Sequence, residues 1–345
     1  MKKHILLVAG ILLITSCKST KNLTSAELTS NSKIITKYAN TITVEDLKKH
    51  VFTLASDEME GRNTGDKGQK MAAAYLADQY KKMGLPGNHL TDDYYQIVPL
   101  EALKKRSKNP SENVIAFIEG TEKPNEILVI TSHYDHVGIK DGKIYNGADD
   151  DASGTSAVVE IAEAFAKAKK AGYGPKRSIL FINFTGEEKG LLGSAYYAEN
   201  STYPMENFVA ALNIDMIGRI GYDHPGDENY VYVIGADRLS SELHVINENA
   251  NNKYVNMDLD YTYNAADDKN RFYYRSDHYN FAKHNVPIIF YFNGVHDDYH
   301  KHTDTPDKIH LELLTKRTKL VFYTAWEIAN REDRLVVDKA EPKKD

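Results

Sequence analysis

Cysteine is almost absent from this chain of 345 residues, which contains one, Cys17. An internal disulfide is therefore excluded, and stability has to come from a hydrophobic core or from bound metal. Positive charge is also in the minority, with 43 Lys and Arg against 49 Asp and Glu, so nucleic acid is not an expected partner. The sequence has no G-x-S-x-G, P-loop or H-E-x-x-H motif, which argues against the enzyme classes that these motifs mark.

No long apolar run is present either, and the most apolar segment is the start of the chain, "MKKHILLVAGILLITS". It is too short to span a membrane comfortably, and its two lysines before an apolar stretch are typical of an export signal over residues 1–16. The ending "ITSC" resembles a bacterial lipobox, in which the cysteine becomes the lipidated first residue of the mature protein. We therefore expect an exported protein of the cell envelope, periplasmic or associated with the outer membrane, whose sole membrane contact is a lipid on Cys17. A plain secretory signal with an incidental cysteine is the alternative.

The rest of the chain divides into three parts. Residues 17–40 combine the attachment site with a segment rich in Ser, Thr, Asn and Lys, which predicts a tether. Residues 41–335 have the composition of one globular domain, and residues 336–345 form a charged tail that we expect to be solvated. The oligomeric state is left open by the sequence.

Apolar strand-like runs alternate with helical patterns along the globular part. Val44, Leu47, Val51 and Leu54 share one helical face after Thr43, a suitable N-cap, and a second helix ends at Gly84. Further helices are predicted at about 153–171, 188–199, 238–251, 277–285 and 310–331. The strand-like runs between them are "ENVIAFIEG", "EILVITSHYD", "RSILFINFTGEE", "FVAALNID", "YVYVIG" and "PIIFYF". This alternation predicts an α/β fold, a single domain with a mostly parallel central sheet covered by helices on both faces.

Histidine and carboxylates follow several of these strands directly. "ILVIT" leads into "SHYDH", "ILFINFT" into "GEE" and "VAALNI" into "DMIG", while "YNGADDDASG" precedes a helix. The carboxyl ends of strands in an open α/β sheet are where ligands bind, so we expect these turns to meet in one crevice. The residues offered there are His133, Asp135, Asp149 to Asp151, Glu187, Glu188 and Asp215.

So much negative charge in one crevice requires a cation. Imidazole mixed with carboxylate, without thiols, favours zinc over calcium or magnesium, with manganese or cobalt as substitutes. His300 and His302, in "DDYHKHTDTPDKI", add a second source of imidazole. These ligands exceed the needs of one ion, which indicates two metals bridged by a carboxylate.

Five motifs in order, "SHYDHVG", "NGADDDASG", "FTGEEKGLLGS", "NIDMIG" and "DYHKHTDTPDKI", resemble those of the di-zinc aminopeptidase and glutamate carboxypeptidase family of metallopeptidases. The likeness extends over about residues 43–331. It implies the zinc-dependent exopeptidase fold and two zinc ions per chain. It also implies that the ligands of one ion are His133 and Asp215, and those of the other Glu188 and His300, with Asp150 as the bridge before a non-proline cis peptide bond.

The same resemblance suggests the remaining roles. Glu187 would take a proton from a water bridged between the zinc ions and pass it to the leaving amine. Tyr299 would donate a hydrogen bond to the oxyanion, Asp135 would hold the second nitrogen of His133, and Asp304 that of His300. Asp149 and Asp151 are expected to cap the following helix or to support the metal ligands through hydrogen bonds.

The predicted function is therefore that of a zinc exopeptidase that removes N-terminal residues from peptide substrates, since an acidic crevice stabilises a free amine. A carboxypeptidase or another peptidase specificity is the main alternative, with Arg271 and Arg275 as the candidate cations for a substrate carboxylate. A glutaminyl cyclase and a non-catalytic binding domain are further alternatives. Five histidines are expected to be solvated or hydrogen-bonded residues of the surface: His136, His278, His284, His296 and His302.

Overall fold

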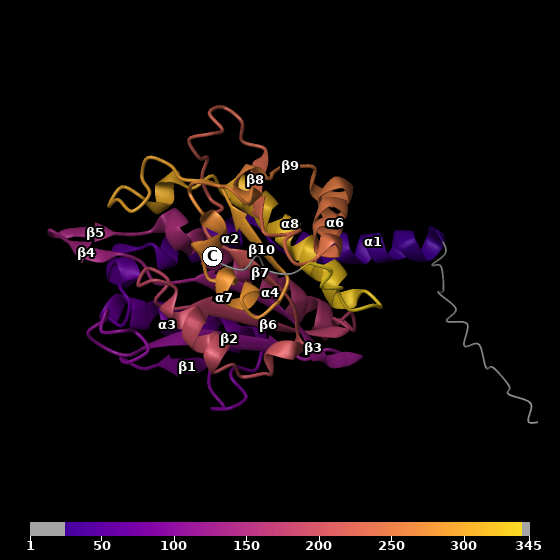
Figure 1. Ribbon diagram of the computed structural model, residues 1–345, viewed down its shortest axis with the longest axis horizontal. Helices are drawn as coiled ribbons and strands as arrows, with labels where there is room; N and C mark the ends of the chain where they lie inside the picture. Colours follow the sequence, from indigo (N-terminus) through magenta and orange to yellow (C-terminus); the bar gives the residue numbers. More distant parts are fainter. Residues whose placement is uncertain (1–24, 340–345) are drawn as a thin grey trace, which may run out of the picture.

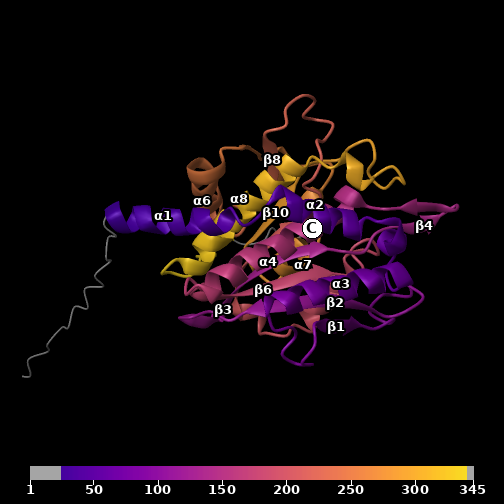
Figure 2. The same ribbon diagram turned by 180° about the vertical axis from the view of Figure 1, so that it is seen from behind.

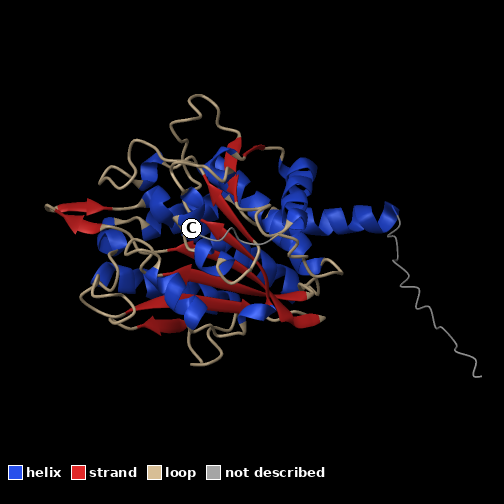
Figure 3. Ribbon diagram, viewed as in Figure 1, coloured by secondary structure: helices blue, strands red, loops and turns tan. Residues whose placement is uncertain are grey.

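An eight-stranded mixed sheet organises residues 25–339, the part of the chain that this computed structural model describes. The strand order is β1-β2-β6-β3-β7-β10-β8-β9, and the four central strands β6, β3, β7 and β10 run parallel, so the predicted α/β class is confirmed. The strands are β1 (Tyr95–Val98), β2 (Ser111–Ile118), β3 (Lys123–His133), β6 (Arg177–Phe184), β7 (Phe208–Ile214), β8 (Tyr230–Ile234), β9 (Asp258–Asp260) and β10 (Ile288–Phe292). A separate hairpin of β4 (Gly138–Lys140) and β5 (Lys143–Tyr145) projects from one end of the domain (Figures 1 and 3).

Helices cover both faces of this sheet, as Figure 1 and the reverse view in Figure 2 show. The helices are α1 (Ser25–Ala39), α2 (Val44–Leu54), α3 (Lys67–Met83), α4 (Gly154–Lys170), α5 (Leu192–Glu199), α6 (Ser241–Ala250), α7 (His278–Ala282) and α8 (Leu311–Asn330). Two predicted ends are confirmed: the Thr43 side chain accepts a hydrogen bond from the backbone N–H of Asp46, and α3 stops at Gly84, whose φ is 75°. Across residues 25–339, none of the helices combines the length and the apolarity that crossing a membrane requires.

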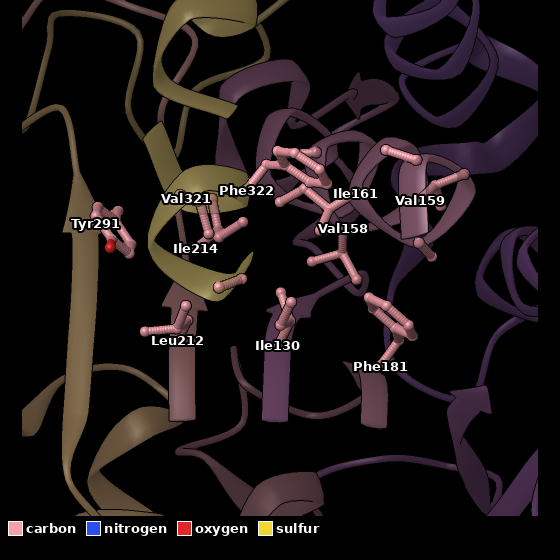
Figure 4. Packing of buried hydrophobic residues seen from close by; sticks show 14 of the residues in the cluster. Ile130, Val158, Val159, Ile161, Phe181, Leu212, Ile214, Tyr291, Val321 and Phe322 are labelled. Atoms are coloured by element: carbon pink, nitrogen blue, oxygen red, sulfur yellow. The ribbon is translucent and has the colours of Figure 1, made fainter. Parts of the chain in front are cut away.

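The alternation of buried side chains along the central strands produces two cores. Leu128 and Ile130 of β3 face the larger core beneath α4 and α8, whereas Ile127 and Val129 face the smaller one, which α5 and α7 cover. Figure 4 shows the larger core, where residues of α4 and α8 pack onto those of the strands. Because both faces are buried, the central strands are apolar almost throughout, and polar chemistry is confined to their ends.

One segment differs from the expectation. Residues 25–39, which we assigned to the tether, form helix α1, whose C-terminal part packs on α4 and α8. Tyr38 and Ala39 are buried in the larger core, and Ile34 and Ile35 pack against it. This short apolar end stabilises a helix in a segment whose polar composition predicted no helix. The expected export signal and lipid attachment site lie outside the described residues.

Candidate metal centre

The carboxyl ends of the four central parallel strands carry the predicted ligands. His133 is the last residue of β3, Asp215 follows β7 directly, Glu188 lies just beyond β6, and His300 is in the loop after β10. Asp150 comes from the turn before α4. These strand ends meet at one edge of the sheet, which is why residues up to 167 positions apart converge there.

Two sets of donor atoms share the Asp150 carboxylate. In the first set, His133 Nε2 lies 3.2 Å from Asp150 Oδ1 and 3.5 Å from Asp215 Oδ1. In the second, His300 Nε2 lies 3.0 Å from Asp150 Oδ2 and 3.2 Å from Glu188 Oε1. The structure thus brings all five predicted ligands together, with one oxygen of Asp150 in each set.

The donor atoms fit a metal pair. Asp150 Oδ2 and Glu188 Oε1 are buried and have no hydrogen-bond partner among residues 25–339, which is unusual for carboxylate oxygens. Imidazole with carboxylate, and no thiolate, is the donor chemistry that zinc accepts. Although burial opposes both shifts, Asp150 and Glu188 raise the pKa of His300 to about 10, and His136 and His300 lower that of Glu188 to about 2. Histidine binds a metal in its neutral form, so a bound dication would take the place of the protons on these histidines and balance the carboxylates.

The Asp150 backbone is held by Asp304. The Asp304 carboxylate accepts hydrogen bonds from the backbone N–H groups of Asp149, at 3.0 Å, and Asp150, at 3.2 Å. The prediction that it holds the second nitrogen of His300 is wrong, because its carboxylate is directed at the backbone of the aspartate run. The peptide bond between Asp150 and Asp151 is cis, as the resemblance implied.

The flanking aspartates support the turn. Asp151 Oδ1 accepts hydrogen bonds from the backbone N–H groups of Gly154, at the start of α4, and of Met216. Asp149 accepts one from the backbone of Gly218 and contacts His296 Nε2 at 3.0 Å. Both carboxylates are fully buried, and their hydrogen bonds match the capping and supporting roles that we expected.

Asp135 positions Glu187, the candidate for proton transfer. We expected its carboxylate to hold the second nitrogen of His133, but the backbone oxygen of Asp135 does so, at 3.1 Å, while the carboxylate is 3.8 Å away. Asp135 Oδ1 instead accepts a hydrogen bond from the backbone N–H of Glu187, at 3.1 Å. The prediction for the carboxylate is therefore wrong, and Asp135 links the first donor set to Glu187.

A pocket opens beside the donor atoms. Its polar lining includes Glu187, Tyr299 and Arg275, and five apolar residues also line it: Met216, Phe272, Phe290, Phe292 and Val295. Burial and the Asp215 carboxylate raise the pKa of Glu187 well above its usual range, although His133 opposes them. Burial and the surrounding carboxylates also raise the pKa of Tyr299, so its hydroxyl stays protonated.

Several residues around the centre were missed by the sequence analysis. Arg62 is completely buried and donates to the backbone oxygens of Tyr134, Leu54, Asn146 and Gly147, yet none of the five motifs contains it. His136, His278 and His296 are buried, so the prediction of surface positions is wrong for these three. His136 lies at the metal centre itself.

Comparison with known proteins identifies the family. Residues 113–325 match the family described as Peptidase family M28. This chain belongs to peptidase family M28. A probable zinc metalloprotease of Pyrenophora teres f. teres (strain 0-1) is 32% identical over 161 residues, which cover 45% of this chain and 32% of that protein. A probable glutamate carboxypeptidase of Arthroderma benhamiae is 41% identical over 108 residues, covering 31% of this chain and 14% of that protein.

Among solved structures, this M28 chain superposes on the LapA aminopeptidase of Legionella pneumophila with a TM-score of 0.68. The sequences are 21% identical, and the match covers 96% of this chain and 81% of LapA, so the likeness establishes the fold. The M28 chain spans a third or less of the two curated relatives above. Membership of M28 confirms the predicted family and its zinc dependence.

Proposed function

We propose that this M28 protein is a di-zinc aminopeptidase that removes N-terminal residues from peptides. The observation that carries the proposal is the Asp150 carboxylate, whose two oxygens belong to two separate donor sets. Glu187 lies beside them in the pocket and takes part in neither set. Two metal positions next to an uncommitted carboxylate are what hydrolysis by a metal pair requires.

The residues that would hold the ions are His133, Asp150 and Asp215 on one side, and Asp150, Glu188 and His300 on the other. A zinc pair bound there would supply polarisation of the scissile carbonyl and acidification of the attacking water. The neighbouring hydrogen bonds keep the donors in place: Ser276 Oγ donates to Asp215 Oδ2 at 2.6 Å.

Glu187 moves the proton in this proposal. Its carboxylate takes a proton from the attacking water and gives it to the leaving amine, and a raised pKa favours the first of these two steps. The hydrogen bond from the Glu187 backbone to Asp135 sets where that carboxylate stands. Tyr299, which stays protonated in the same pocket, donates a hydrogen bond to the developing oxyanion.

The pocket lining supports recognition of an amino terminus. Glu187 lines it and takes part in neither donor set, so its carboxylate is available to stabilise a free α-amine. LapA, which this fold resembles, is named an aminopeptidase. The apolar wall of Phe272, Phe290 and Phe292 would accept apolar side chains.

One observation favours a second candidate, carboxypeptidase activity. Arg275 lines the same pocket beside Phe272, and its guanidinium carbon lies 4.8 Å from the centre of that ring. Within residues 25–339, no carboxylate forms an ion pair with Arg275 within 4.0 Å, so its charge is available to a substrate carboxylate. A matched relative is named a probable glutamate carboxypeptidase, which agrees with this candidate.

Four versions of one peptide distinguish the two candidates: the amino end free or acetylated, and the carboxyl end free or amidated. We expect acetylation to abolish cleavage and amidation to leave it intact, with the N-terminal residue released first. If amidation abolishes cleavage and acetylation does not, the carboxypeptidase assignment replaces this one.

We also propose that the protein is exported and anchored to the cell envelope by a lipid on Cys17. The support is the sequence of residues 1–17 alone: two lysines, a short apolar run and "ITSC". An anchored peptidase would act on peptides at the membrane surface.

A further inference from the structure

His136 lies against the second donor set with its ring completely buried. Its Nδ1 is 2.9 Å from Glu188 Oε1 and 3.7 Å from Asp150 Oδ2. His300 Nε2 approaches the same two oxygens at 3.2 Å and 3.0 Å. Donor atoms of one tetrahedral zinc ion, with bonds of about 2.1 Å, stand roughly 3.4 Å apart. All four measured separations are close to that value.

These contacts are not hydrogen bonds. Although His136 Nδ1 is within 2.9 Å of Glu188, neither ring nitrogen of His136 has a hydrogen-bond partner in the described part of the chain. Glu188 Oε1 and Asp150 Oδ2 are also without one. The contact between His296 and Asp149 has a similar length, 3.0 Å, but does have hydrogen-bond geometry. One ligand atom from each of His136, Asp150 and Glu188 lies within 4.8 Å of the other two, which is the spacing expected of donors that share one ion.

The surrounding chain holds the His136 ring in this orientation. A Cβ atom on Gly147 would lie 2.5 Å from His136 Cγ and 2.6 Å from Cδ2, so only glycine leaves room for the ring. Arg62 ties the two segments together, because its backbone oxygen accepts from the His136 N–H at 3.0 Å and its guanidinium donates to Gly147 O at 2.8 Å. The Nδ1 atom is therefore fixed in position before any ligand binds.

We propose that His136 Nδ1 is a fourth protein ligand of the ion held by Asp150, Glu188 and His300. This inference rests on the metal centre proposed above and adds a residue to it. The two metal positions then differ: the second has four protein donors, whereas His133, Asp150 and Asp215 supply three to the first. A site with four protein donors is closed and holds zinc more tightly, and a site with three keeps a position open to water or substrate.

The wild-type protein tests the ligand count directly. With both positions loaded with zinc, X-ray absorption spectra report the number of imidazoles around the metal. We expect scattering from three imidazoles shared by two ions, namely those of His133, His136 and His300. Scattering from two imidazoles in a protein that holds two zinc ions overturns the assignment of His136 and leaves the proposed function intact.

A variant tests the difference in affinity. His136→Gln keeps a polar group near the position of Nε2 and has no donor atom at that of Nδ1. We expect titration with a competing chelator, with zinc content measured by mass spectrometry, to show that the tighter site of the wild type is weakened at least about tenfold. The more exchangeable site should be little changed.

His50→Gln is the matched control. His50 is also buried and faces a carboxylate, Glu160, at 3.2 Å, but both of its ring nitrogens form hydrogen bonds, the other one to Tyr75. Zinc affinity should be unchanged in this variant. If His136→Gln titrates like the wild type and the control, His136 is not a ligand. If the wild type binds no zinc, the proposed function fails together with this inference.

Discussion

Replacement of Glu187 by glutamine separates metal binding from proton transfer. Glutamine has nearly the same shape as glutamate but cannot take up a proton from water. The Glu187 contact with Asp135 is made by the backbone N–H, so the substitution preserves it. Because the Glu187 carboxylate belongs to neither donor set, the variant should bind as much zinc as the wild type.

The expected loss is in turnover. General base catalysis by a positioned carboxylate contributes about 10²–10⁴-fold, or roughly 3–5 kcal/mol of activation free energy. Folding should not suffer, since burial raises the pKa of Glu187 well above its usual range and the ionised form is therefore costly to bury. The melting temperature of the variant should equal or exceed that of the wild type.

The neighbouring residue supplies the comparison. Glu188→Gln makes the same chemical change one position later, at a donor whose Oε1 is 3.2 Å from His300 Nε2. We expect this variant to lose zinc, whereas Glu187→Gln keeps it. The measurements are turnover of an unblocked peptide and zinc content per chain. If Glu187→Gln loses zinc, or retains wild-type turnover, the role assigned to Glu187 is wrong.

Four other outcomes follow from the structure. A strong chelator should abolish hydrolysis and added zinc should restore it; activity in a metal-free sample would contradict the proposal. Burial lowers the pKa of His278 from 6.5 to about 3. Below about pH 6.5 the unfolded chain therefore binds a proton at His278 that the folded chain does not, and the free energy of unfolding decreases as the pH is lowered. Urea unfolding at about pH 7 and about pH 5 should show a loss for the wild type that exceeds that of His278→Gln by up to about 2 kcal/mol, and equal losses would refute this. Gly147→Ala should cost at least about 1–2 kcal/mol and reduce zinc content, because Gly147 has a φ of 57° and its Cβ would be 2.3 Å from Asp150 O; an unchanged melting temperature would count against it. Cys17→Ser should release the protein from membranes or block its processing, and fractionation that finds it still membrane-bound would remove the support for a lipid anchor.

Local patterns in the sequence were sufficient for much of the fold. The alternation of apolar strands with amphipathic helices predicted the α/β class, and signals such as Thr43 and Gly84 marked helix ends that the structure has. These features depend on neighbouring residues only, because capping and helical periodicity act within a few positions. The same approach missed α1, whose stability comes from packing of Ile34, Ile35 and Tyr38 on distant helices.

The metal ligands were also within reach of the sequence. His133, Glu188 and Asp215 stand at or just beyond strand ends, and strand ends of a parallel sheet meet at one edge. Asp150 lies in the turn before α4, and His300, in the long loop after β10, was indicated by the motif resemblance. The position of a residue along the chain therefore indicated where its side chain would lie. What it did not indicate was which neighbour each polar atom would contact.

Those contacts were decided by the tertiary structure. Asp135 and Asp304 hold backbone N–H groups where ligand histidines were expected, and Arg62 enters the centre from a segment that carries no metal motif. His136 became a donor candidate only when its Nδ1 was found 2.9 Å from Glu188 Oε1, with Gly147 leaving room for the ring. Sequence periodicity specifies the face on which a residue lies, whereas the partner of a buried polar atom depends on loops whose paths are set by packing across the whole domain.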